Sequence, residues 1–154
     1  MNIFALSNNP QEAAQMLCNK HVGKMLVESA QIICSAMFLL GQEKTPYKPT
    51  HLKHPCVSWT ASAPENMKWL YEHALELCKE NFKRYGKMHK TQDVVLALRV
   101  PDCDSREHNP FVLAMPDKYK SSDAIQSYRN YYIGEKSKFA KWEPKTQVPY
   151  WWPR

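Results

Sequence analysis

The sequence has only four glycines among its 154 residues. It contains neither the GxGxxG pattern of dinucleotide-binding folds nor a Walker A loop. Such loops depend on clustered glycines, because a backbone without side chains can approach phosphate oxygens closely. Their absence argues against ATP- or NAD-dependent chemistry. The chain also lacks a GxSxG segment, so the nucleophile elbow of α/β-hydrolases is not expected.

Cysteine pairs and long apolar runs are missing as well. The five cysteines are scattered, and no CxxC pair occurs, which predicts free thiols in a reducing compartment. The segment HLKHPC (51–56) offers two histidines and a cysteine, but no second ligand cluster accompanies it, so we expect no metal site and no cofactor. With no apolar run of roughly 18 residues and no signal-peptide pattern, the sequence predicts a cytoplasmic protein without a membrane partner.

The sequence is instead rich in cations and aromatics. Lys and Arg number 21 against 15 for Asp and Glu, a net charge of +6, and there are five Trp and eight Tyr. Cations neutralise phosphates and aromatic rings stack on bases, so this composition favours nucleic acid as the partner. The alternative is that these segments are ordinary surfaces of amphipathic helices. The segments are RYGKMHK (84–90), DKYK (117–120), YRNYY (128–132) and GEKSKFAKW (134–142).

Apolar spacing predicts one compact all-α domain over residues 1–154, with three to four helices and long loops. A first helix is expected from Pro10 to Leu40 and a second from Pro64 to Tyr85, with Gly86 as its C-cap. A short helical segment is expected over Val94–Val100. A last helix is expected from the capping residues 121–123 to about Trp142. The apolar face expected for the first helix comprises Ala14, Cys18, Val22, Met25, Ser29, Ile32, Ile33 and Ala36.

Residues 41–63 are expected to form a long loop. Long loops in small domains are often functional, and this one contains Tyr47 and Trp59 in basic surroundings. We therefore expect one of these two rings to stack on or near the substrate.

Four polar residues border the apolar face of the first predicted helix. His21, Lys24, Glu28 and Gln31 are spaced by three, four and seven residues, so they project to one side. A polar stripe at the edge of a core is a suitable floor for an active site. The alternative is a solvated flank with a Lys24–Glu28 ion pair of little energetic value.

The segment LCNKHVGKMLVESAQI (17–32) resembles the first helix of the pyrimidine-dimer DNA glycosylases of the phage endonuclease V type. In that family a short N-terminal lead enters a helix that carries a His and, seven residues later, the catalytic Glu; here these positions hold His21 and Glu28. HPCVSW (54–59), the helix ending in RYG, and the aromatic, Lys-rich C-terminal part are also similar to the family. The chain looks like small uncharacterised phage proteins placed near it.

The resemblance implies an all-α monomer that acts on duplex DNA with a flipped nucleotide, in a bacterial or phage-infected cell. It implies attack on the sugar by the N-terminal α-amine, here that of Met1, with Glu28 and His21 as further catalytic residues. An α-amine has a reference pKa of about 8, so part of it is neutral and nucleophilic at cell pH. The expected nucleic-acid-binding residues are Lys24, Gln31, His54, Trp59, Arg84, Tyr85, Lys87, Arg129, Tyr132, Lys136 and Trp142.

The sequence departs from the family pattern in two places. Residue 2 is Asn, which usually leaves Met1 in place, whereas the family uses the amine of a small residue. Val27 and Gln31 stand where the family has arginines. These differences argue against specificity for the dimer and, less strongly, against the lyase step, and they favour a modified base, a different lesion or a free nucleotide as the substrate. The leading hypothesis is a DNA glycosylase, with or without AP-lyase activity, that acts on a damaged or modified base. Two alternatives stay open: a base- or nucleotide-modifying enzyme that uses Glu28 and His21 without a Schiff base, and a non-enzymatic DNA-binding phage protein.

Overall fold

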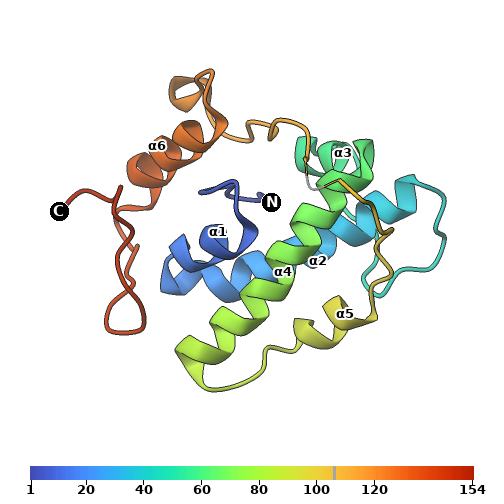
Figure 1. Ribbon diagram of the computed structural model, residues 1–154, viewed down its shortest axis with the longest axis horizontal. Helices are drawn as coiled ribbons and strands as arrows, with labels where there is room; N and C mark the ends of the chain where they lie inside the picture. Colours follow the sequence, from blue (N-terminus) through green and yellow to red (C-terminus); the bar gives the residue numbers. More distant parts are fainter. Residues whose placement is uncertain (106) are drawn as a thin grey trace.

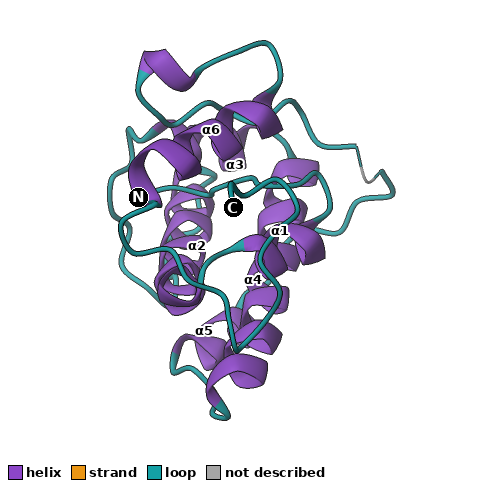
Figure 2. Cartoon of the chain, turned by 90° about the vertical axis from the view of Figure 1, so that its left-hand side faces the viewer, coloured by secondary structure: helices purple, strands orange, loops and turns teal. Residues whose placement is uncertain are grey.

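Two long helices, α2 (Asn19–Leu39) and α4 (Pro64–Tyr85), pack against each other at the centre of the molecule (Figure 1). The computed structural model describes residues 1–105 and 107–154, and over these ranges the secondary structure is entirely helical, as predicted. The shorter helices α1 (Pro10–Met16), α3 (Pro55–Ser62) and α5 (Thr91–Ala97) contact the central pair. The 3-10 helix η1 (Asp117–Tyr119) and α6 (Ala124–Lys136) follow on the side of the N-terminus (Figure 2).

The predicted apolar face of the first helical region is confirmed, since all eight of its residues are buried. By length and composition α2 is also apolar enough to cross a membrane, with a mean hydropathy of 1.4 over its most apolar stretch. However, 61% of that stretch is buried inside the fold. Packing against α3, α4 and α5 therefore accounts for the apolar character of α2.

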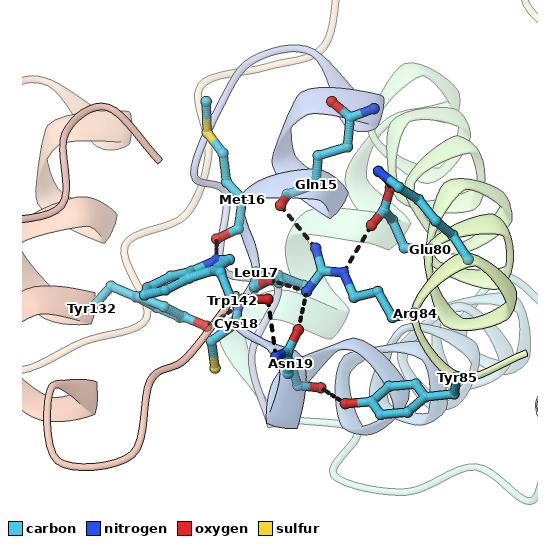
Figure 3. Close-up of polar contacts among 11 residues, drawn as sticks. Gln15, Met16, Leu17, Cys18, Asn19, Glu80, Arg84, Tyr85, Tyr132 and Trp142 are labelled. Atoms are coloured by element: carbon cyan, nitrogen blue, oxygen red, sulfur yellow. Dashed lines mark hydrogen bonds and ion pairs between the residues drawn. The ribbon is translucent and has the colours of Figure 1, made fainter. Parts of the chain in front are cut away.

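The prediction of one helix from Pro10 to Leu40 is wrong, because the helix is interrupted at Leu17 and Cys18, between α1 and α2. We call this interruption the break. Both residues have extended backbone angles, with ψ of 139° and 160°. The break contains no Pro or Gly, and the apolar period continues through it, so the local sequence gives no warning. Side chains distant in sequence satisfy the backbone groups that the break exposes: Arg84 binds the carbonyls of Gln15 and Leu17 (Figure 3).

The prediction of a continuous loop over residues 41–63 is also wrong, because α3 forms inside it. The ring of His54 caps this helix by accepting a hydrogen bond from Cys56 N at 3.0 Å, and Pro55 occupies the first turn. Proline is common at this position, since the missing N–H has no partner in the first turn of a helix. The helix buries Trp59, whose indole N–H donates to Pro110 O at 2.9 Å.

The predicted bounds of α4 are confirmed, and Gly86 ends the helix in the left-handed region with φ of 70°. The last predicted helix is shorter than expected: Asp123 caps α6 through Gln126 N, and the helix ends at Lys136. The chain then turns back, so that Trp142 N–H donates to Met16 O at 2.9 Å. Near the end of α4, Phe82 is 57% exposed, while the charged residue Arg84 is buried.

Arg84 anchors the break between α1 and α2. Its side chain is fully buried, and its guanidinium pairs with Glu80 at 2.9 Å and donates to Leu17 O and Gln15 O at 2.6 and 2.9 Å. We predict that Arg84→Met, which keeps much of the side-chain volume, lowers the free energy of unfolding by about 3–5 kcal/mol, because Glu80 and two carbonyls lose their partner. Urea denaturation measures this loss. Lys83→Met, at the exposed neighbouring position, is the control and should change stability by less than about 0.5 kcal/mol. Equal effects of the two substitutions would contradict the anchoring role.

Candidate active site

The N-terminal lead, residues 2–7, is buried and curled. The Asn2 side chain accepts hydrogen bonds from the backbone N–H groups of Ile3 and Phe4, at 2.7 and 2.9 Å, and donates to Ala114 O at 2.7 Å. Phe4 adopts a φ of 40°, a left-handed conformation uncommon for a residue with a side chain. These contacts fix the chain immediately after Met1, so the α-amine has a defined position.

The Met1 nitrogen lies 3.3 Å from Glu28 Oε1. The Met1 side chain is only 5% exposed, whereas the residue as a whole is half-buried, so much of its exposed surface belongs to the main chain that carries the amine. The other oxygen of Glu28, Oε2, is buried and has no hydrogen-bond partner among the described residues. Within the same residues no ion pair joins Glu28 to Lys24. The structure thus brings together two of the residues predicted to be catalytic.

The first turn of α3 lies beside this pair. Burial lowers the pKa of His54, the positive charges of the Met1 amine and His51 lower it further, and Glu28 and a hydrogen bond with the Met1 backbone raise it in part. Burial likewise raises the pKa of the Cys56 thiol to about 12, against the effect of the Met1 amine. We call Met1 and Glu28, together with His54 and Cys56 at the start of α3, the amine cluster. Sequence spacing alone did not place Cys56 there.

His21, the third predicted catalytic residue, is buried on α2, about two turns before Glu28. Cys18 N donates to Tyr132 OH at 3.0 Å, and the Tyr132 hydroxyl lies 2.9 Å from His21 Nδ1. The Tyr132 hydroxyl therefore bridges the first residue before α2 and the His21 ring. Burial, together with Lys136, Lys24 and Lys20, lowers the pKa of His21 to about 4. His21 is therefore a buried, neutral imidazole that is hydrogen-bonded to Tyr132, and its catalytic role stays a prediction.

Three lysines surround His21, and two of them were predicted to bind nucleic acid. Lys24 and Lys20 belong to α2, while Lys136 comes from α6. Lys136 Nζ lies 5.2 Å from the ring centre of Tyr131 and 5.6 Å from that of Phe4. Lys20 Nζ lies 4.7 Å from the ring centre of Phe139. We call Lys20, Lys24, Tyr131, Lys136 and Phe139 the basic–aromatic face.

Sequence reasoning missed part of this face. Lys20 was detectable, because it precedes Lys24 by one helical turn. The choice between Tyr131 and its neighbour Tyr132 required the orientation of α6: Tyr132 is fully buried and Tyr131 is half-buried.

Several side chains predicted to contact DNA are buried instead, which contradicts that role. Arg84, Tyr132 and Trp142 instead form hydrogen bonds with backbone groups at the break between α1 and α2 (Figure 3). The expected stacking of a loop ring is wrong for Trp59, which packs on Trp69 and Phe111 at ring distances of 6.5 and 5.3 Å. The exposed fractions are 2% for Arg84, 0% for Tyr132, 2% for Trp142 and 7% for Trp59.

The other predicted DNA contacts lie at separate places. Tyr85 and Lys87 are exposed at the end of α4, where the Tyr85 hydroxyl donates to Asn19 O at 2.7 Å. Arg129 is half-buried and donates to Leu6 O and Tyr150 OH, both at 3.0 Å. Gln31 is half-buried one turn beyond Glu28 on α2. Among these residues only Gln31 shares a helix with the amine cluster.

Tyr47, the other loop ring, is half-buried, and its hydroxyl lies 2.9 Å from Thr91 Oγ1. Among the described residues no three His, Cys, Asp or Glu side chains lie close enough together to hold a metal ion.

The fold and the amine cluster define an all-helical protein in which the N-terminal amine lies against a carboxylate on the apolar helix α2. Residues 1–93 match the model of the pyrimidine dimer DNA glycosylase family. The match covers more than half of the chain, and the protein belongs to this family of DNA glycosylases. No curated protein and no solved structure matches the chain. The matched range contains the whole amine cluster and excludes α6.

Two buried histidines make stability sensitive to acid. Burial lowers the pKa of His21, and also that of His73 on α4, from 6.5 to about 4. Between these values the unfolded chain takes up protons that the folded chain refuses, so the stability is complete above pH 6.5 and is lost as the pH falls toward 4. We predict a loss of up to about 1.4 kcal/mol per pH unit for each histidine, measured by urea denaturation. His21→Asn retains an acceptor for Tyr132 and should reduce this slope. An unchanged slope would contradict the assignment.

Proposed function

We propose that the protein is a DNA glycosylase with AP-lyase activity that uses the Met1 α-amine as nucleophile and Glu28 as its carboxylate partner. The substrate is a damaged or modified base in duplex DNA. The observation that carries the proposal is the 3.3 Å distance between Met1 N and Glu28 Oε1. Family membership supports the glycosylase activity, while the nucleophile and the lyase step are our inference.

The geometry is compatible with nucleophilic catalysis at the sugar. Glu28 accepts the proton that the ammonium must lose before the amine can attack, and the neutral amine then bonds to C1′ of the damaged nucleotide. The glycosidic bond breaks, and its electron pair leaves with the base. The bond between C1′ and the ring oxygen then opens, and the sugar remains attached through C1′ as a protonated Schiff base. The two protons that the original ammonium gives up end on the base and on the ring oxygen, with Glu28 carrying them. Because the Met1 side chain is packed into the protein, it does not block the approach of the sugar to the amine.

The unpaired oxygen of Glu28 offers a second function. A buried carboxylate oxygen without a hydrogen bond is costly, and its negative charge is not offset by any partner among the described residues. We propose that Oε2 stabilises the positive charge that develops on the sugar as the base departs. In this proposal Oε1 of Glu28 pairs with the amine, and the charge on Oε2 stabilises the sugar cation.

The basic–aromatic face supports binding of the phosphate backbone beside the amine. Lys24 is exposed one turn before Glu28, and Lys136 approaches from α6. Extruding a nucleotide costs a few kcal/mol, which stacking on a half-buried ring such as Tyr131 can offset. Val27 and Gln31, in place of the family's arginines, are half-buried beside Glu28 and provide no positive charge there. We therefore propose a target other than the dimer.

Replacing Glu28 tests the chemistry. Glu28→Gln keeps the shape and removes the charge, so we predict that turnover on a cleavable substrate, or on abasic DNA, falls by about two to four orders of magnitude. DNA affinity and melting temperature should remain nearly unchanged. Glu76→Gln is a matched control, because Glu76 is similarly exposed and pairs with Lys79 at 3.0 Å. If Glu28→Gln only destabilises the fold, or has no effect, Glu28 is a structural residue.

The α-amine is tested by borohydride trapping of a covalent adduct with abasic DNA. Acetylation of the amine should abolish trapping, since an amide nitrogen forms no Schiff base. Loss of activity in Glu28→Gln together with full activity of the acetylated protein would overturn the Schiff-base route.

DNA binding should depend steeply on salt. Each phosphate contact contributes about −0.9 to the slope of log K against log salt, so Lys24→Ala combined with Lys136→Ala should flatten the slope by about 1.8. Lys79→Ala is the control, because Lys79 lies on α4 and pairs locally with Glu76. Fluorescence anisotropy with a short duplex at several salt concentrations measures the slope. Affinity that is independent of salt would count against phosphate binding by this face.

A further inference from the structure

An apolar groove lies on the outer face of α4, bounded by α5 and by the start of α1 (Figure 1). It has a volume of about 770 Å³, and its apolar lining consists of Leu75, Cys78, Phe82, Met88 and Leu96. Three of these side chains are largely exposed, with exposed fractions of 57% for Phe82, 59% for Met88 and 55% for Leu96. Contiguous apolar side chains on a surface mark a site of interaction.

Four charged residues of α4 also line the groove, namely Glu72, Glu76, Lys79 and Lys83. They are spaced by three and four residues, so they form one row along the helix. The two acids precede the two lysines, so the row is neutral although the chain carries a net charge of +6. Within one chain Glu76 pairs with Lys79 at 3.0 Å, and Lys83 with Glu80 at 3.9 Å. A neutral row does not attract a phosphate backbone, which argues against nucleic acid as the occupant of this groove.

We propose that the groove binds a second copy of the chain, in a two-fold dimer in which α4 packs antiparallel against α4 of the second copy. An axis at the midpoint of the charged row sets Glu72 opposite Lys83 of the second copy, and Glu76 opposite Lys79 of the second copy. The two-fold axis repeats both pairs, because the same surface is used on each side. Lys79 can keep its local contact with Glu76 as well, since an ammonium group has three N–H donors.

The same arrangement covers the apolar side chains. In an antiparallel helix pair related by a two-fold axis, each flank of one helix faces the same flank of the other. The charged row therefore meets the charged row, and the apolar flank meets the apolar flank. Leu75 and Phe82 lie on either side of the midpoint, so Phe82 of each copy packs near Leu75 of the other. The register that pairs the charges thus also buries the exposed ring.

The dimer leaves the proposed active site free. No described residue of the groove belongs to the amine cluster or to the basic–aromatic face, and α5 and α6 lie at opposite ends of the molecule (Figures 1 and 2). The inference therefore does not rest on the proposed function. One groove offers less surface than the extended interfaces of obligate dimers, so we expect association at micromolar concentration and a monomer at nanomolar concentration. The monomer implied by the family resemblance is then the dilute state.

Glu72 and Lys83 provide a test of the register. They lie about three turns apart on α4, roughly 16 Å along the helix, so they do not touch within one copy. Glu72→Lys sets two lysines against each other across the axis, and Lys83→Glu does the same with two glutamates. Combining the two substitutions restores opposite charges in every pair with the signs exchanged. Any energetic coupling between these positions therefore acts between copies.

Sedimentation equilibrium from nanomolar to millimolar concentration measures the dissociation constant of each variant. We expect each single substitution to weaken the dimer by at least about tenfold, because the axis repeats the repulsion, and the double variant to associate within about threefold of the wild type. The melting temperature at low concentration checks that each variant is folded.

The apolar part of the interface is tested with Phe82→Ser, which we expect to weaken the dimer by at least about tenfold. Leu40→Ser is the matched control, because Leu40 is 61% exposed, does not line the groove and should not affect association.

The inference is overturned if the wild type stays monomeric up to millimolar concentration, which would assign the groove to a different occupant. It is also overturned if the double variant associates no better than the single variants, or if Leu40→Ser dissociates the dimer as strongly as Phe82→Ser. Failure of the proposed function would leave all of these outcomes unchanged, since the measurement needs neither DNA nor the amine.

Discussion

The buried guanidinium of Arg84 is the interaction on which the arrangement of the helices depends. A charged group inside a protein is tolerated only when it is paired and its donors are occupied. Arg84 meets this requirement with Glu80 and with the carbonyls of Gln15 and Leu17. Those carbonyls are available only because the helix breaks between α1 and α2. The interruption of the helix and the buried charge therefore require each other. Together they set the direction of α2 relative to α1.

The junction between α1 and α2 also binds the C-terminal part of the chain. Asn19 N donates to Lys141 O at 2.8 Å, Trp142 N–H donates to Met16 O at 2.9 Å, and the Tyr132 hydroxyl accepts from Cys18 N. These bonds dock α6 and the residues that follow it onto the N-terminal region. As a result Lys136 lies above Phe4 of the lead. The basic–aromatic face is thus assembled from the range that matches the family and from residues beyond it.

Much of the fold could be predicted from local patterns. The break in the first helix could not, because it depends on a contact between residues distant in the sequence. The apolar face around α2, the bounds of α4 and the caps at Asp123 and Gly86 depend on periodicity and on single capping residues. The break at Leu17 depends on Arg84, which lies 67 residues away. No local pattern reveals that Arg84 faces inward while Phe82 faces solvent.

The predicted site divides in the same way. The stripe from His21 to Gln31 lies on one side of α2 as predicted, because spacing alone determines which residues of a helix share a side. Spacing does not determine which of them are buried. His21 lies under Phe4 at a ring distance of 5.1 Å, whereas Lys24 remains exposed. Basic and aromatic segments have the same composition whether their rings face the core or the solvent, so composition does not reveal that Lys136 is partly exposed while Trp142 is buried.

The side chains of Met1 and Asn2 together hold the N-terminus in one position. An amine on a flexible end would sample many positions, but here the Met1 side chain is 5% exposed and anchors the first residue to the core. The Asn2 side chain meanwhile satisfies the backbone N–H groups of its two successors. If Met1 were removed, the amine would move to Asn2, about 3.8 Å along the chain, and would leave the carboxylate of Glu28 unpaired. The proposed use of the Met1 amine therefore requires that the methionine is retained, as expected from Asn at position 2. The departure from the family's small N-terminal residue is therefore consistent with a site built around the amine of Met1 itself.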